Sequence, residues 1–198
     1  MHVPPGAVIN TTAQSVDPSG HITPATTTMM WNQDYQASFL QILSKYPGVI
    51  TQTLAAHTHM DEFRIMAPNN VLDITPGITP YFDNNPAFKV FTFSRDTLTA
   101  TDYTSLNYDL ATMPAQFNSY YTFSTSYSMH GLLDNSLAQL YPALATDNAK
   151  QTLYRANYYS GRNYTNAFNP ITNTNWPVFW CGIGKMDQKG FIDCVNNY

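Results

Sequence analysis

The clearest periodic pattern of the chain lies between residues 31 and 46. Apolar residues recur there every three or four positions, at Trp31, Tyr35, Phe39, Ile42, Leu43 and Tyr46. This spacing places them on one face of a helix, which the following Pro47-Gly48 pair would end. The apolar and β-branched run 49–56 predicts a buried strand that leads into His57-Thr58-His59. Such an order is typical of an α/β layer with its site at the strand tips.

Other segments carry weaker patterns. Residues 1–6 predict the end of a strand followed by a stiff Pro-Pro-Gly bend, and the Thr-, Ser- and Pro-rich stretch 9–28 predicts a long loop. Two aromatic and β-branched segments predict an antiparallel hairpin that closes the main sheet, and capping-type residues and apolar spacing predict three later helices. The hairpin segments are 88–93 and 98–108, and the helices are 134–141, 147–158 and 187–195.

Charge and composition exclude several classes of partner. Only 11% of the 198 residues are charged and the net charge is −4, so the chain has no basic surface for nucleic acid or for an anionic membrane. It contains no apolar run of about 18 residues and therefore no transmembrane segment. Its polar residues are mainly Asn, Thr, Ser and Tyr, as in many exported proteins. We expect a secreted, periplasmic or extracellular protein whose signal peptide lies upstream of Met1.

The two cysteines, Cys181 and Cys194, lie close together near the C-terminus. An even, local pair is expected to form a disulfide in an oxidising compartment. The alternative is that both are reduced core cysteines.

His57 and His59 form the first candidate site. In an extended segment, side chains two positions apart lie on the same side of the chain, so both imidazoles would face one point. Two neutral imidazoles suit a divalent transition metal. The alternative is a pair of surface or packed histidines.

The residues around this pair resemble a known signature. The segment Ala56-His57-Thr58-His59-Met60-Asp61-Glu62-Phe63-Arg64 resembles the Gly-His-Thr-His-x-Asp-Glu-Phe motif of acid sphingomyelinase and its phosphodiesterase relatives, within the calcineurin-like metallophosphoesterases. The N-terminal His2-Val3-Pro4-Pro5-Gly6 resembles the His-Ile-Pro-Pro-Gly segment that precedes the motif in that family. Further similar segments follow in the same order, at 78–81, 84–90, 102–104 and in the cysteine-bearing tail. Ala56 departs from the usual Gly of the motif.

The resemblance implies a fold and an activity. Residues 1–113 would be the C-terminal half of a four-layer α/β/β/α metallophosphoesterase sandwich, and residues 114–198 a small helical subdomain. The family binds two divalent metals, zinc in this interpretation, with His2 and His57 on one ion and His59 on the other. Such a centre clamps a phosphoester substrate, activates a bound water and hydrolyses the ester.

The resemblance also suggests roles for neighbouring residues. Asp61 and Glu62 are candidates to support the ligating histidines from behind, because such histidines usually donate their other N–H to a carboxylate. Tyr81, Asn84 and Asn85 would lie near the substrate mouth. The alternative for all five is ordinary turn chemistry. His21 and His130 match no motif and are interpreted as surface or structural residues.

Part of the family's site has no counterpart in these 198 residues. The family supplies an Asp-x-His motif, a bridging Asp and an Asn-His motif from an N-terminal half. Without the anionic ligands two dications repel each other, so we expect this chain to hold one metal ion well at most. We assign no catalytic residue in this half and expect the isolated chain to be inactive or nearly so. The missing half of the same protein is then its expected partner. The alternatives are a non-catalytic metal- or ligand-binding extracellular module, and an unrelated Tyr- and Asn-rich β-domain without metal.

Overall fold

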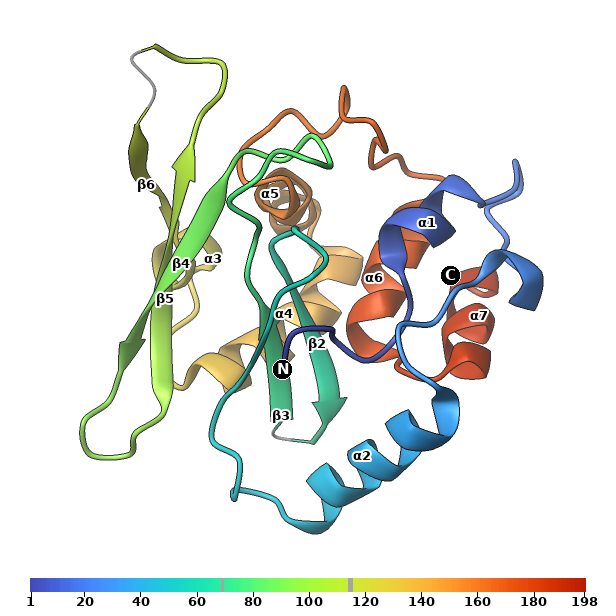
Figure 1. Cartoon of the computed structure of the whole chain (residues 1–198), viewed down its shortest axis with the longest axis horizontal. Coiled ribbons are helices and arrows are strands. Elements are labelled where there is room, and N and C mark those ends of the chain that lie inside the picture. Colours follow the sequence, from blue (N-terminus) through green and yellow to red (C-terminus); the bar gives the residue numbers. More distant parts are fainter. Residues whose placement is uncertain (69, 114–115) are drawn as a thin grey trace.

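The computed structural model of the chain describes residues 1–68, 70–113 and 116–198 and shows a mixed α/β fold (Figure 1). Its strands form two separate three-stranded sheets, with strand orders β1-β3-β2 and β4-β5-β6. The strands are β1 (Thr53–Ala55), β2 (Glu62–Ala67), β3 (Asn70–Ile74), β4 (Ala87–Phe93), β5 (Ala100–Tyr108) and β6 (Phe117–Thr122). The helices are α1 (Ile9–Gln14), the 3-10 helix η1 (Pro24–Thr26), α2 (Gln33–Lys45), α3 (Phe123–Tyr127), α4 (Leu133–Thr146), α5 (Asn148–Tyr158), α6 (Trp176–Gly184) and α7 (Gln188–Asn196).

Helix α2 confirms the strongest sequence prediction. The Asn32 side chain caps it by accepting hydrogen bonds from the backbone N–H groups of Asp34 and Tyr35. One face of α2 packs against the first sheet, in a small core that includes Leu43 of the helix and Ala55 of β1. In that sheet β3 is central, antiparallel to β2 and parallel to β1.

The predicted strand over 49–56 is shorter than expected. Only Thr53–Ala55 pair, with the last residues of β3, while Val49 and Ile50 are exposed. The apolar run is therefore partly a surface segment, because no described strand pairs with its first half.

The predicted loop over 9–28 is also partly wrong. It contains α1, which buries Ile9, Thr12 and Ala13, and the 3-10 helix η1. Helix α1 has 6 residues and η1 has 3, which is too few to show a periodic apolar pattern, so neither could be predicted from periodicity. Residues 1–6 form no described strand, but the Met1 amino group donates to the Leu54 carbonyl and Ala56 donates to the His2 carbonyl, so the start of the chain lies along β1.

The second sheet confirms the predicted hairpin and extends it. Strands β4 and β5 pair antiparallel, and β6 pairs antiparallel with β5 on its other side. The hairpin forms its own sheet and does not close the first one. Strand β6 lies in the region predicted to be helical, because its sequence, Phe-Asn-Ser-Tyr-Tyr-Thr, is too polar at its start to stand out as a strand.

The three predicted C-terminal helices are present. Asp147 and Asp187 cap α5 and α7 through their side chains, and α4 continues through Pro142 to Thr146, beyond the predicted end at residue 141. Helix α6 was not predicted. Its sequence is apolar on nearly all sides, so it lacks the one-sided pattern that identifies a surface helix, and it lies buried in the centre of the main core.

The two predicted parts of the chain share this main core. It runs from Ala7 near the N-terminus to Val195 in α7 and includes Phe63 of β2 and Tyr103 of β5. The predicted boundary at Pro114 lies outside the described residues, and β5 and β6, on its two sides, pair with each other.

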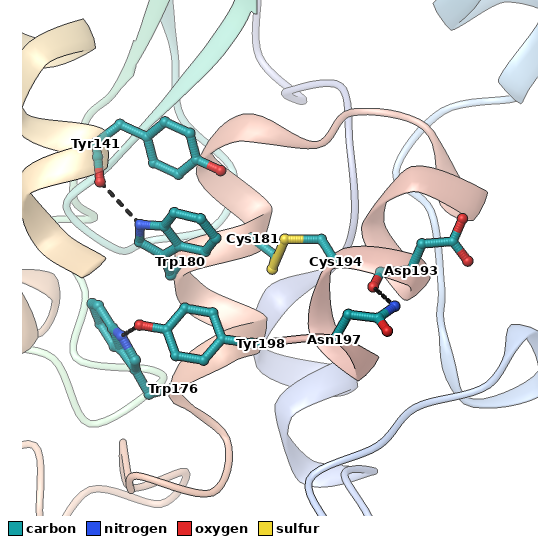
Figure 2. Close-up of a disulfide and its surroundings, with 8 residues drawn as sticks. All are labelled: Tyr141, Trp176, Trp180, Cys181, Asp193, Cys194, Asn197 and Tyr198. Carbon is teal, nitrogen blue, oxygen red and sulfur yellow. Dashed lines mark hydrogen bonds between the residues drawn. A yellow bond between two sulfur atoms is a disulfide. The ribbon is translucent and has the colours of Figure 1, made fainter. Parts of the chain in front are cut away.

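The predicted disulfide between Cys181 and Cys194 joins α6 to α7 (Figure 2). Around it the Trp180 indole stacks on Tyr141 with 4.7 Å between ring centroids and donates to the Tyr141 carbonyl. Trp176 donates to the Tyr198 hydroxyl, which ties the last residue to the same helix. Among the described helices, none has both the length and the apolar character that crossing a membrane requires.

Removing the disulfide should lower stability without changing the fold. The two cysteines are 13 residues apart, and closing a loop of this size stabilises a protein by about 3 kcal/mol through the unfolded chain. We expect the double variant Cys181→Ala with Cys194→Ala to lose about that much free energy of unfolding in a urea titration. Reductant should shift the wild-type curve toward the variant and leave the variant's curve in place. A wild-type midpoint that ignores reductant would contradict this prediction.

Candidate metal centre

His2 and His57 lie side by side although 55 residues separate them. The Nε2 atom of His2 is 3.3 Å from the Nδ1 atom of His57, and the two rings meet edge to face with centroids 5.1 Å apart. Both side chains are exposed, so the nitrogen pair is open to solvent. The structure thus brings together the two histidines that were predicted to share an ion.

Arg64 holds the segment that carries His2. This buried guanidinium donates from Nη1 to the Pro5 carbonyl and from Nη2 to the Ala7 carbonyl, at 3.0 Å. Gly6 between them has φ +98°, and a Cβ there would lie 2.6 Å from Arg64 Nη1, so glycine is required for both its conformation and its space. The Pro-Pro-Gly bend of the first motif is therefore held by the arginine that ends the second motif.

His57 and His59 lie in a tight turn rather than at the tip of a strand. Strand β1 ends at Ala55, and the two histidines have φ values of +73° and +66°. The prediction that they project to the same side of an extended segment is therefore wrong. Left-handed backbone is unfavourable for residues with a Cβ and is concentrated at functional sites.

His59 has its own surroundings. Its Nδ1 atom is 3.3 Å from the Thr79 hydroxyl, and its ring meets Phe82 edge to face with centroids 5.4 Å apart. Gly77 packs against it so closely that a Cβ would lie 2.8 Å from His59 Cγ. These contacts of His59 thus come from the loop 75–86, whereas His57 contacts His2.

The His2–His57 pair fits one metal ion. Two nitrogens on a tetrahedral zinc at about 2.0–2.1 Å are about 3.3 Å apart, which is the observed separation. A direct hydrogen bond between one protonated and one free nitrogen fits the same distance. Among the described residues no three His, Cys, Asp or Glu side chains gather closely enough to hold an ion by themselves. The pair therefore fits as part of a ligand set.

Asp61 and Glu62 have cationic partners instead of histidine partners. Both are buried. An Asp61 oxygen lies 2.7 Å from Lys89 Nζ, and Glu62 Oε2 lies 3.5 Å from Arg64 Nη2. Both side chains point into the core. Among the described residues, neither carboxylate makes a hydrogen bond to a histidine.

Lys89 and Asp73 were not singled out from the sequence. Lys89 Nζ is 2.8 Å from Asp73 Oδ1 and 2.7 Å from Asp61 Oδ1, and it lies over the Tyr103 ring. The Tyr121 hydroxyl donates to the second oxygen of Asp61. A signal was available, because Lys89 and Asp73 are single charges in otherwise apolar strand sequences.

The three buried charges do not balance. Lys89 offsets one carboxylate, and the other is a surplus negative charge in the interior. Burial raises the pKa of Asp73 to about 7, because it outweighs the attraction of Lys89, and Asp61 raises it further. Asp134 has a pKa raised to about 6, also by burial.

Of the three residues predicted at the substrate mouth, only Tyr81 is exposed. The buried Asn84 amide donates to the carbonyls of Gly77 and Thr79, and the buried Asn85 amide donates to the Ser160 carbonyl. These two contacts fix the loop 75–86 around His59 and join it to the end of α5.

A cavity of about 110 Å³ lies beside His57. The residues that line it belong mainly to α1 and its N-cap, the segment just before α2, the histidine turn, the loop 75–86 and the end of α5. Its apolar walls are Val8, Ile9, Met30, Phe82 and Tyr158. A small apolar group next to a metal-bound phosphate would fit there.

Comparison with known proteins agrees with the motifs. No protein-family model matches the chain. It is 25% identical over 202 residues to sphingomyelin phosphodiesterase B of Dictyostelium discoideum, covering 90% of this chain and 31% of that protein. It is 26% identical over 196 residues to cyclic GMP-AMP phosphodiesterase SMPDL3A of Mus musculus, covering 91% and 44%. It is 26% identical over 199 residues to acid sphingomyelinase-like phosphodiesterase 3b of Homo sapiens, covering 89% and 43%.

About 90% of the chain is thus similar to acid sphingomyelinase-like phosphodiesterases at 25–26% identity, which supports the family that the motifs indicate. The chain spans between 31% and 44% of the length of these three relatives.

The buried charges predict a pH dependence of stability. The pKa of the Asp73 carboxyl is about 7 in the folded chain, against an ordinary value of 3.8 that applies to the unfolded chain. Between about pH 4 and pH 7 the folded state therefore binds a proton that the unfolded state lacks. The stabilisation is complete below about pH 4 and is lost as the pH rises through 7. We expect the free energy of unfolding to fall by up to about 1.4 kcal/mol per pH unit between pH 5 and pH 7.

The variant Asp73→Asn should show a flatter profile over this range, and the remaining slope would come from Asp61 and Asp134, whose carboxyl pKa values are also raised by burial. Urea titrations at each pH would measure both profiles. Equal slopes in the variant and the wild type would contradict the assignment to Asp73.

Proposed function

We propose that the chain carries the histidine half of a two-metal phosphodiesterase centre. The observation that supports this most is the 3.3 Å separation of the His2 and His57 nitrogens, together with the contact between the bend that ends the first motif and the arginine that ends the second. His2 and His57 would hold one ion and His59 a second, with zinc as the metal that suits imidazole ligands. The names of the relatives support phosphodiester hydrolysis as the reaction.

The bound metals would supply a water of lowered pKa and charge stabilisation for the phosphoryl oxygens. The chain's own residues have simpler roles. His2 and His57 present their paired nitrogens at the exposed surface, while Thr79 can orient the His59 ring through its Nδ1 atom. The apolar cavity beside His57 would exclude water from one side of the substrate, and the exposed Tyr81 would border the mouth.

The remaining ligands would come from the rest of a longer protein. In that protein the first sheet of this chain would form part of a four-layer α/β/β/α sandwich, with residues 114–198 as a small helical subdomain. The disulfide between Cys181 and Cys194 supports an oxidising location, secreted or otherwise outside the cytosol.

A second candidate function is a non-catalytic metal-binding module. It is favoured by the absence, among the described residues, of a third ligand close to the histidine pair. The two candidates differ in whether added upstream sequence creates activity.

Zinc binding tests the ligand assignment. We expect the wild-type chain to bind one zinc ion in a calorimetric titration, and His57→Ala to weaken binding by at least about tenfold because one of two imidazoles is lost. His130→Ala is the matched control, since this histidine lies outside both motifs, and it should bind zinc like the wild type. Equal loss in the two variants would point to unspecific binding by surface histidines.

Hydrolysis tests the need for the missing ligands. With zinc present, the 198-residue chain should leave bis(4-nitrophenyl) phosphate uncleaved, because a lone ion without its bridging carboxylate cannot form the two-metal clamp. The chain produced together with in-frame upstream coding sequence should cleave it. Enzyme-like turnover by the 198-residue chain alone would contradict the proposal, and inactivity of the longer protein would favour the module.

A further inference from the structure

The turn that carries His57 and His59 needs support from outside itself. Both residues have left-handed backbone, with φ values of +73° and +66°. Residues with a Cβ persist in this region only where the surrounding structure holds them there. The contacts that hold the turn therefore decide where the two imidazoles lie.

Three backbone hydrogen bonds attach the turn to other segments. Ala56 donates to the His2 carbonyl at 3.0 Å, Gly77 donates to the His59 carbonyl at 3.0 Å, and Asp61 donates to the Tyr158 carbonyl at 3.1 Å. The first two partners belong to surface segments near the site. After the turn, Met60 packs into the main core, and Asp61, where the chain enters β2, is held there by a buried ion pair as well as by its backbone.

The side-chain anchor of Asp61 is Lys89. The three N–H groups of this ammonium have three buried acceptors, Asp61 Oδ1 at 2.7 Å, Asp73 Oδ1 at 2.8 Å and the Ile74 carbonyl at 3.2 Å. The same nitrogen lies 4.4 Å from the centroid of the Tyr103 ring. Lys89 on β4 thus joins the second sheet to β3 of the first sheet and to the histidine turn.

We propose that Lys89 is a positioning residue of the histidine centre, meaning the proposed ligands His2, His57 and His59. It acts on the turn that carries His57 and His59 through Asp61. This inference rests on the proposed function, because it assigns the purpose of the contact to the histidines. A buried group of three charges adds little stability over apolar packing of the same volume, but it fixes the positions of the groups it joins. The polar contacts of Lys89 within the described residues are with Asp61, Asp73 and Ile74, and none is with a histidine. Its effect on the histidines must therefore be transmitted by the main chain from Asp61 to His59.

The variant Lys89→Met tests this role, because methionine fills similar space without the ammonium. Two readouts follow the histidines directly, the NMR signals of the imidazole rings in the metal-free chain and the zinc affinity in a calorimetric titration. We expect the ring signals of His57 and His59 to shift and the zinc affinity to fall about tenfold, the lower end of the effect of partners behind a ligand. Asp73→Asn should have a smaller effect, since it keeps the contact between Lys89 and Asp61.

Two control variants separate positioning from general loss of stability. Leu144→Ala removes a fully buried side chain of α4 and destabilises the core away from the turn. Lys189→Met makes the same substitution at an exposed ion pair. Both should leave the ring signals and the zinc affinity as in the wild type.

Each result decides the inference. A folded Lys89→Met chain with unchanged ring signals and zinc affinity would overturn it. If that variant does not fold, the double variant Lys89→Met with Asp73→Asn, which leaves one unpaired carboxylate instead of two, takes the same test. If the wild type binds no zinc but the ring signals still move in the Lys89 variants, the proposed function fails while the positioning role stands.

Discussion

The histidine centre depends on the contact between the Arg64 guanidinium and the carbonyls of Pro5 and Ala7. His2 comes from the start of the chain and His57 from a turn 55 residues later, and two backbone hydrogen bonds join their segments, from Met1 to Leu54 and from Ala56 to His2. A buried arginine on β2 fixes the bend that follows His2, and Gly6 allows the backbone to approach it. An unpaired guanidinium in the core would be costly, so the interior that buries Arg64 also requires the bend that places His2.

A second buried cation acts on the other side of the centre. Lys89 joins β4 to Asp61 and Asp73, while Asn84 and Asn85 join the loop around His59 to its own carbonyls and to α5. The exposed imidazoles are therefore carried by short segments whose conformations are set by fully buried polar groups. This arrangement suits a site that must keep its ligands in place before an ion binds.

The sequence predicted the elements with strong local signals and the residues with distinctive motifs. Helix α2, the β4–β5 hairpin and the caps Asp147 and Asp187 depend on neighbours in sequence, and these predictions are confirmed. Helix α6 is apolar on all sides and β6 is partly polar, so neither carries a periodic signal.

The roles of single residues in the site were harder to predict, because they depend on contacts between distant segments. The motif identified His2, His57 and His59, but it could not show that Asp61 turns toward Lys89 or that Asn84 is buried. Those facts follow from contacts between β4 and the first sheet and within the loop 75–86, which spacing in the sequence does not reveal. The left-handed backbone of the two histidines is likewise a product of tertiary contacts, since positive φ is uncommon for any residue other than glycine.

We propose above all that His2 and His57 together bind one metal ion in this chain. Crystals of the chain grown with zinc, measured at the zinc absorption edge, would test it most directly. The account predicts an anomalous peak about 2.0–2.1 Å from both His2 Nε2 and His57 Nδ1. An ordered site with no peak between these two nitrogens, or a peak only at His21 or His130, would contradict it.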